Sequence, residues 1–197
     1  MIEFRSTFSI TEDPTPAIQT AIKDVWEIYQ AFAAYTIGEA FDLELPRDSS
    51  GLRTRWQGGA SMKGHGLLLY YDRAAPGGLL PSWRSATTRP ASERPDITLV
   101  DQAGQRVMVL DVKYSVDKQG RCRSEHLFEM QGYMNSFRID KAAIVFPGDP
   151  VDARGYCGNG YTLAEAPLRA RDILNARDEQ LRRLRSQLEE LWSTIPN

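Results

Sequence analysis

The stretch from Arg94 to Tyr114, RPDITLVDQAGQRVMVLDVKY, constrains the fold more than any other part of the chain. Two apolar runs, at 97–100 and 107–110, flank the turn-forming residues 101–105, which include Gly104. This pattern is typical of two antiparallel strands joined by a tight turn. Two acidic residues and a lysine stand where a sheet normally places apolar side chains, which is an unusual use of a core hairpin.

The two acidic residues of this hairpin are expected to lie close together. Side chains alternate along a strand, so Asp111 and Lys113 project from the same face. Folding of the hairpin brings Asp96 near position 110 or 111, where cross-strand Cβ atoms lie about 4.5–5.5 Å apart. Carboxylates this close are costly to bury unless a cation lies between them. Mg²⁺ fits, with the carbonyl of Val112 as a further ligand, and Lys113 then orients a nucleophile or stabilises an anionic transition state.

The order of these motifs resembles the PD-(D/E)XK nuclease superfamily. Pro95-Asp96 precedes Asp111-Val112-Lys113 at the end of the next strand, as in the superfamily signature. The sequence that follows is similar to the McrC-type nuclease subunits of modification-dependent restriction systems: DVKY, a polar loop, a helix with HLFEMQGYMNSF, then a strand AAIVFPG. The resemblance covers roughly residues 25–148. D-x-K alone occurs by chance in many chains, so a surface hairpin with solvated charges is the alternative.

The resemblance implies further site residues. In the family a glutamate of the first core helix completes the metal site, which points to Glu27 here, although a partly exposed helix glutamate is the competing interpretation. Relatives carry a glutamine and a tyrosine four residues apart beside the metal. Glu129 takes the glutamine position and Tyr133 matches the tyrosine. The extra carboxylate of Glu129 can join the metal or pair with an arginine, and a structural role for both residues stays open.

Two overlapping sets of residues are therefore predicted. The catalytic set is Asp96, Asp111, Lys113, Glu27, Glu129 and Tyr133. The metal ligands are Asp96, Asp111, Glu27 and Val112, with Mg²⁺ as the cofactor and Mn²⁺ as a substitute.

The distribution of charge, more than its total, suggests where a nucleic acid would bind. The 24 basic residues nearly balance the 26 acidic ones. Residues 1–44 hold two basic and eight acidic side chains, whereas residues 45–94 hold eight basic and three acidic ones, which would attract a duplex. A flexible, solvated insert is the alternative for residues 74–93. The predicted nucleic-acid contacts are Arg53, Arg55, Arg84, Arg89, Arg121 and Arg123.

The expected fold is α/β, with a central mixed β-sheet flanked by helices in a restriction-endonuclease-like core over residues 1–167. The first core helix, at about 16–41, is apolar almost all round and should be largely buried. The strand GHGLLLYYDR should lie first in the sheet, and a nearly continuous apolar run should form a strand buried on both faces. The predicted boundaries of the strands are 64–73, 95–114 for the hairpin, 141–147, and 161–164 for a short edge strand.

Two further helices are expected. Ser124 should cap one at about 125–137, with His126, Glu129 and Tyr133 in one stripe. A long C-terminal helix at about 168–192, within a segment from 168 to 197, has leucines at alternating threes and fours. It can dock on its own domain or form a homodimer or partner contact as a coiled coil.

Several features narrow the function. Cys122 and Cys157 lack the spacing of a zinc site or an iron–sulfur cluster. No secretory signal or membrane-spanning run is visible, so a cytoplasmic location is expected. We expect a metal-dependent DNA endonuclease of a prokaryotic or phage restriction or defence system. No Walker loop is visible, so any motor NTPase would be a separate subunit. No reader domain is recognisable, so a recognition domain would lie elsewhere or on a partner. The alternatives are a non-cleaving or partner-dependent DNA-binding subunit and cleavage of RNA.

Overall fold

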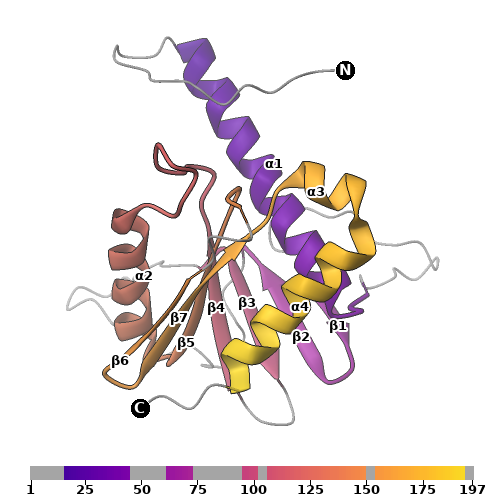
Figure 1. Cartoon of the computed structure of the whole chain (residues 1–197), viewed down its shortest axis with the longest axis vertical. Coiled ribbons are helices and arrows are strands. Elements are labelled where there is room, and N and C mark those ends of the chain that lie inside the picture. The colour runs from indigo at the N-terminus through magenta and orange to yellow at the C-terminus, as the bar shows by residue number, and fades with distance from the viewer. Residues whose placement is uncertain (1–15, 45–60, 73–94, 102–105, 150–153, 194–197) are drawn as a thin grey trace, which may run out of the picture.

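The computed structural model in Figure 1 contains a seven-stranded β-sheet with helices on both faces. It describes residues 16–44, 61–72, 95–101, 106–149 and 154–193. The strands are β1 (Ser61–Gly64), β2 (Leu67–Tyr71), β3 (Ile97–Asp101), β4 (Arg106–Val112), β5 (Lys141–Phe146), β6 (Gly155–Gly158) and β7 (Tyr161–Pro167). The helices are α1 (Pro16–Ala40), α2 (Ser124–Phe137), α3 (Ala170–Asn175) and α4 (Arg177–Ser193).

The sheet is mixed, as predicted, with the order β1-β2-β3-β4-β5-β7-β6. Strands β1 to β4 pair antiparallel in chain order, β4, β5 and β7 are parallel, and β6 returns antiparallel along β7. Helix α2 supplies the crossover that a parallel connection from β4 to β5 requires. Every residue of β5 is buried, as expected of a strand covered on both faces.

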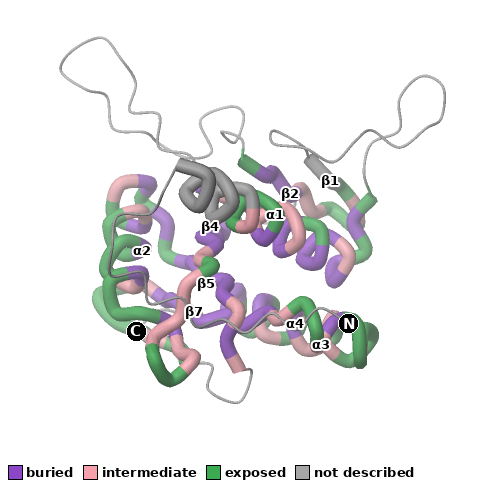
Figure 2. The backbone as a smooth tube through the Cα atoms, turned by 90° about the horizontal axis from the view of Figure 1, so that it is seen from above, coloured by how far each residue is buried: buried purple, intermediate pink, exposed green. Residues whose placement is uncertain are grey.

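Alternation along β4 divides the hydrophobic core into two clusters. Leu110 and Val112 pack on the side of α1 and α4, whereas Val109 packs on the side of α2 with Met130 and Met134. In Figure 2 buried residues lie between α2 and the opposing helices. Asp111 follows the same alternation as Val109 and therefore projects from the face that α2 covers.

Two strand predictions were wrong. Residues 61–71 form the β1–β2 hairpin instead of a single strand, and β1 lies at the sheet edge. Its turn contains His65 and Gly66, both with positive φ (49° and 79°), so the glycine-flanked histidine marks a reversal of the chain. The predicted edge strand at 161–164 is the longer β7, which lies between β5 and β6 because a turn at Asn159 and Gly160 folds β6 back along it.

The helix predictions also need correction. Ser124 is the first residue of α2, and the N-cap residue Arg123 makes no side-chain capping bond. The long C-terminal helix is present as α4, but Ala176 (φ −146°, ψ 54°) separates it from α3, and Leu174 is 82% exposed. Leucines of α4 are buried in the cluster shared with α1.

Helix α1 is less buried than its composition predicted. Trp26, Ile28 and Tyr35 are exposed, and the N-terminal part of the helix projects beyond the sheet (Figure 1). Among the described residues, no helix has the combination of length and hydropathy that crossing a bilayer requires.

Candidate active site

The register of the β3–β4 hairpin brings the two predicted aspartates together. Ile97 pairs with Leu110, so Asp96 lies opposite Asp111 just beyond the last paired position. Asp96 Oδ2 accepts a 2.7 Å hydrogen bond from the backbone N–H of Val112. Asp111 is buried and Asp96 is partly buried, so neither charge is well solvated.

Burial and the nearby charge of Asp111 raise the pKa of Asp96. Burial first, and then the charge of Asp111, raises the pKa of Asp96 to about 7, although the Val112 N–H and the Lys113 ammonium oppose the shift. Two carboxylates that share a site repel each other when both are charged. A cation between them would offset that repulsion.

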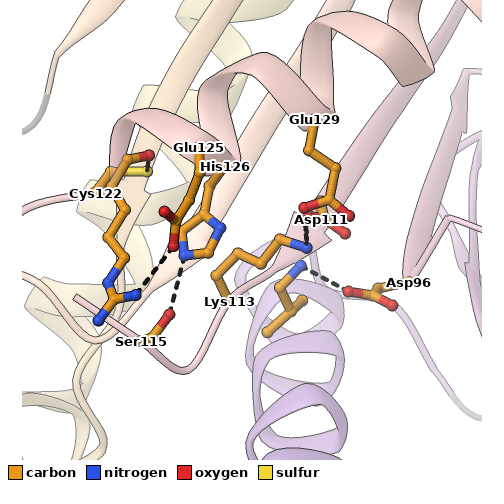
Figure 3. Close-up of polar contacts among 10 residues, drawn as sticks. Asp96, Asp111, Lys113, Ser115, Cys122, Glu125, His126 and Glu129 are labelled. Carbon is orange, nitrogen blue, oxygen red and sulfur yellow. Dashed lines mark hydrogen bonds and ion pairs between the residues drawn. The ribbon is translucent and has the colours of Figure 1, made fainter. Parts of the chain in front are cut away.

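Lys113 supplies one positive charge at this place. Its Nζ lies 2.8 Å from Asp111 Oδ2 and 2.9 Å from Glu129 Oε2 (Figure 3). Burial favours the neutral amine, but the two carboxylates outweigh this effect and raise the pKa of Lys113 above its usual range. The lysine is therefore a fixed cation, and it joins the end of β4 to α2.

Helix α2 brings three polar side chains toward this cluster. Glu129 pairs with Lys113, as described above. The pKa of Tyr133 is raised by burial and then by the charges of Asp111 and Glu129, and its ring stacks on Phe137. His126 Nε2 lies 2.9 Å from Ser115 Oγ. The stripe spacing on the helix included His126, but nothing in the sequence indicated its partner.

Glu27, the predicted metal ligand of the first core helix, lies on α1. It is exposed on α1, which packs against the sheet face opposite Asp111. The pKa of Tyr71 is raised by burial and by the charges of Asp72, Asp96 and Glu27, so Glu27 and Asp96 act on the same tyrosine. Within the described residues, no group of three or more His, Cys, Asp or Glu could hold a metal ion. The ligand role of Glu27 stays a prediction.

Only two of the six predicted nucleic-acid contacts can be located. Arg121 and Arg123 lie in the loop between β4 and α2. The Arg123 side chain donates to the carbonyl of Val116 at 3.1 Å and forms a 3.0 Å ion pair with Glu125, so it holds this loop against the start of α2. The other four, Arg53, Arg55, Arg84 and Arg89, lie outside the described residues.

The aspartate pair has donors that suit a hard divalent cation. Mg²⁺ is typically bound through one or two carboxylates, keeps several waters and takes further oxygens from a substrate phosphate. Asp96 and Asp111 supply the two carboxylates. The ion pair with Lys113 leaves Asp111 Oδ2 without a hydrogen bond of good geometry. The residues present fit a two-carboxylate site, and the carbonyl of Val112 stays a predicted ligand.

No family model matches the chain, and no curated protein matches it. One solved structure is similar to this chain. It is a chain of a refined half-complex from a tetradecameric assembly of Thermococcus gammatolerans McrB AAA+ hexamers with bound McrC. The two share 12% identity at a TM-score of 0.41, over 64% of this chain and 29% of that chain. This chain spans less than a third of that chain's length.

Proposed function

We propose that this chain is a metal-dependent nuclease with a restriction-endonuclease-like core, which hydrolyses phosphodiester bonds in DNA. The observation that carries the proposal is the pairing of Asp96 with Asp111 across the β3–β4 hairpin, with Lys113 Nζ 2.8 Å from Asp111. Clustered carboxylates are costly to keep in an apolar sheet unless they bind a cation. The order of the motifs Pro95-Asp96 and Asp111-Val112-Lys113, which resembles the nuclease superfamily signature, also supports a metal-dependent nuclease.

The chain's own residues divide the chemistry among them. Asp96 and Asp111 would hold Mg²⁺ or Mn²⁺, which supplies Lewis-acid stabilisation of phosphate oxygens when bound. Lys113 directs a permanent positive charge at the same place, where it can orient the attacking water or offset charge on the pentacoordinate phosphorus. Glu129 fixes the lysine through its second ion pair. Tyr133 lies within the electrostatic reach of Asp111 and is a supporting group.

The biological setting rests on the sequence resemblance. By that resemblance the substrate is DNA instead of RNA, the system is prokaryotic or phage restriction or defence, and a motor NTPase is a separate partner. A non-cleaving DNA-binding subunit is the competing function. The retention of both aspartates and the lysine argues against it, since a scaffold without catalytic demand has no need of clustered buried charges.

Plasmid cleavage tests the proposal. Supercoiled plasmid is incubated with the protein in Mg²⁺ or Mn²⁺, with EDTA as the control, and compared with Asp111→Ala. We expect metal-dependent nicking that the variant loses. Glu165→Gln is the matched control, because it changes another buried carboxylate on the same sheet and should keep cleavage. Equal DNA binding without cutting by wild type and Asp111→Ala would support the non-cleaving subunit instead.

A further inference from the structure

Lys113, whose ammonium group is the proposed catalytic charge, lies where the chain leaves the sheet. Strand β4 ends at Val112, and the N–H of the next residue, Lys113, donates a 2.8 Å hydrogen bond to the carbonyl of Val145 on β5. Residues 113–123 contain no helix or strand. Beyond this bond, the backbone that fixes the Lys113 side chain needs support from outside the sheet.

Two adjacent contacts to α2 give that support. Lys113 pairs with Glu129 at 2.9 Å, and two residues later Ser115 Oγ lies 2.9 Å from His126 Nε2 (Figure 3). His126 and Glu129 are three residues apart, so both project from the same side of the helix. The same segment is therefore joined to the same helix twice, once through a charged pair and once through a hydrogen bond.

The environment of His126 favours a neutral imidazole in this contact. The side chain is almost entirely buried. Burial first, and then the charge of Lys113, lowers the pKa of His126, while Glu125, Glu129 and Asp111 act in the opposite direction. A neutral imidazole and a serine hydroxyl are well matched, since each can donate or accept. The contact adds a directional tie without adding charge beside the aspartates.

We propose that Ser115 and His126 form a positioning pair that holds Lys113 beside Asp111. Its catalytic consequence rests on the proposed nuclease function, whereas the positioning itself does not. Neither residue needs to touch the substrate. Without the Ser115–His126 contact, the ring of Tyr114 still contacts Tyr29 on α1 and Arg123 still donates to Val116. The backbone next to Lys113 nevertheless loses its hydrogen bond to α2, which allows the lysine ammonium to move away from its productive position. Small misplacements of catalytic groups cost up to about 100-fold in rate.

The kinetic test uses substitutions that separate hydrogen bonding from packing. The amide nitrogen of Gln stands close to the position of Nε2 in His, whereas that of Asn corresponds to Nδ1 and is too short to reach Ser115. We expect Ser115→Ala and His126→Asn each to lower kcat about tenfold, with KM within about twofold, and His126→Gln to restore most of the rate. The double variant Ser115→Ala/His126→Asn should be no slower than either single variant.

A control and a second readout keep the inference independent of cleavage. Gln131→Asn introduces the same residue at an exposed position of α2, with a larger loss of helix propensity than His126→Asn, and should leave kcat unchanged. Nitrogen-15 NMR of the lysine ammonium groups, with the Lys113 signal assigned by its loss in Lys113→Met, should show that signal shifted or broadened in Ser115→Ala and His126→Asn but retained in His126→Gln.

The outcomes separate the two proposals. Wild-type cleavage with unchanged kcat in Ser115→Ala and His126→Asn would overturn the positioning pair and leave the nuclease standing. Without any wild-type cleavage the nuclease proposal fails, and the Lys113 signal alone decides the positioning. A Lys113 signal that is unchanged in both Ser115→Ala and His126→Asn overturns the positioning pair. A Lys113 signal that changes as expected supports it.

Discussion

Asp111 and Glu165 occupy the same lateral row of the sheet, yet they are buried in different ways. Asp111 aligns with Ile144 on β5, and Ile144 aligns with Glu165 on β7. The two side chains are 5% and 2% exposed and project from the face that α2 covers. Glu165 Oε1 accepts a 2.7 Å hydrogen bond from the hydroxyl of Tyr156. Asp111 instead faces a second carboxylate, Asp96, and a lysine.

The difference separates a carboxylate that accepts a hydrogen bond from a tyrosine hydroxyl from a carboxylate that faces a second carboxylate and a lysine. Burial and the hydrogen bond to Glu165 raise the pKa of Tyr156 to about 12, so the tyrosine stays a neutral donor to a lone carboxylate. At the other position Asp96 and Asp111 repel each other, and burial together with the charge of Asp111 raises the pKa of Asp96. Like charges placed together weaken the fold, and this is why the Asp96–Asp111 pair is the place where we propose a compensating cation.

The largest expected effect is on the rate of cleavage in Lys113→Met. The substitution keeps the length and apolar stem of the side chain but removes the charge between Asp111 and Glu129. Loss of one preorganised stabilising group costs about 100- to 1000-fold in rate, so plasmid cleavage should fall by that amount. Arg182→Met, at an exposed position of α4 outside the proposed site and outside residues 45–94, is the control for loss of a positive charge and should cleave normally. Equal rates in both variants would remove Lys113 from the mechanism.

The next effect is a dependence of stability on pH that belongs to the aspartate pair. The folded state raises the pKa of Asp96 from 3.8 to about 7, so the folded chain holds this proton more tightly than the unfolded chain. The stability that this group contributes is present below pH 4 and is lost as pH rises toward 7, with a slope of about 1.4 kcal/mol per pH unit.

Urea denaturation between pH 4 and pH 8 in EDTA measures this slope. Asp96→Asn should flatten the decline, and Mg²⁺ at the upper end of the range should restore stability to wild type but not to the variant. Identical pH profiles for the two proteins would show that the carboxylates do not interact as described.

A smaller effect is expected at the other end of the row. Tyr156→Phe removes the hydroxyl that donates to Glu165 and leaves a buried carboxylate with fewer partners. A hydrogen bond to a charged group contributes about 1.5–3 kcal/mol, so the free energy of unfolding should fall by that amount. The cleavage rate of the folded variant should be unchanged. A parallel loss of cleavage would show that the two ends of the row act as one unit.

The smallest effect is expected from Glu129→Gln, which restores the residue type that the resembling family carries. The Glu129 side chain is about half exposed, so its ion pair with Lys113 contributes only about 0–1 kcal/mol to stability. Cleavage should change by less than about tenfold, since Gln can still accept a hydrogen bond from the lysine. Thermal melting and cleavage of Glu129→Gln and Glu129→Ala check this, and a complete loss of cleavage in both would assign Glu129 a larger role.

The sequence pattern was sufficient to predict the β3–β4 hairpin, because its strands and turn depend on neighbouring residues. The apolar runs around Gly104 predicted β3 and β4, and strand alternation placed Asp111 and Lys113 on one face. The GHG sequence around His65 was misread because the positive φ of a turn leaves no periodic signal. The interior position of β7 depends on β6 folding back along it, which no spacing in the sequence shows.

The site was predicted in part for the same reason. The approach of Asp96 to Asp111 follows from a short hairpin and could be foreseen. Glu129 was expected to pair with an arginine or a metal, and its partner is Lys113, because the contact depends on how α2 docks on the sheet. The Ser115–His126 contact spans eleven residues through an irregular loop, so its existence depends on the path of that loop.

The most direct test of the central claim is Mn²⁺ binding, followed by electron paramagnetic resonance at pH 8, in wild type, Asp111→Asn and Glu165→Gln. The account predicts that wild type and Glu165→Gln bind Mn²⁺ and that Asp111→Asn loses this binding, because Asp111 belongs to the proposed cation site and Glu165 does not. Equal Mn²⁺ binding by all three proteins, or by none, would contradict the assignment of Asp96 and Asp111 as the metal centre of a nuclease.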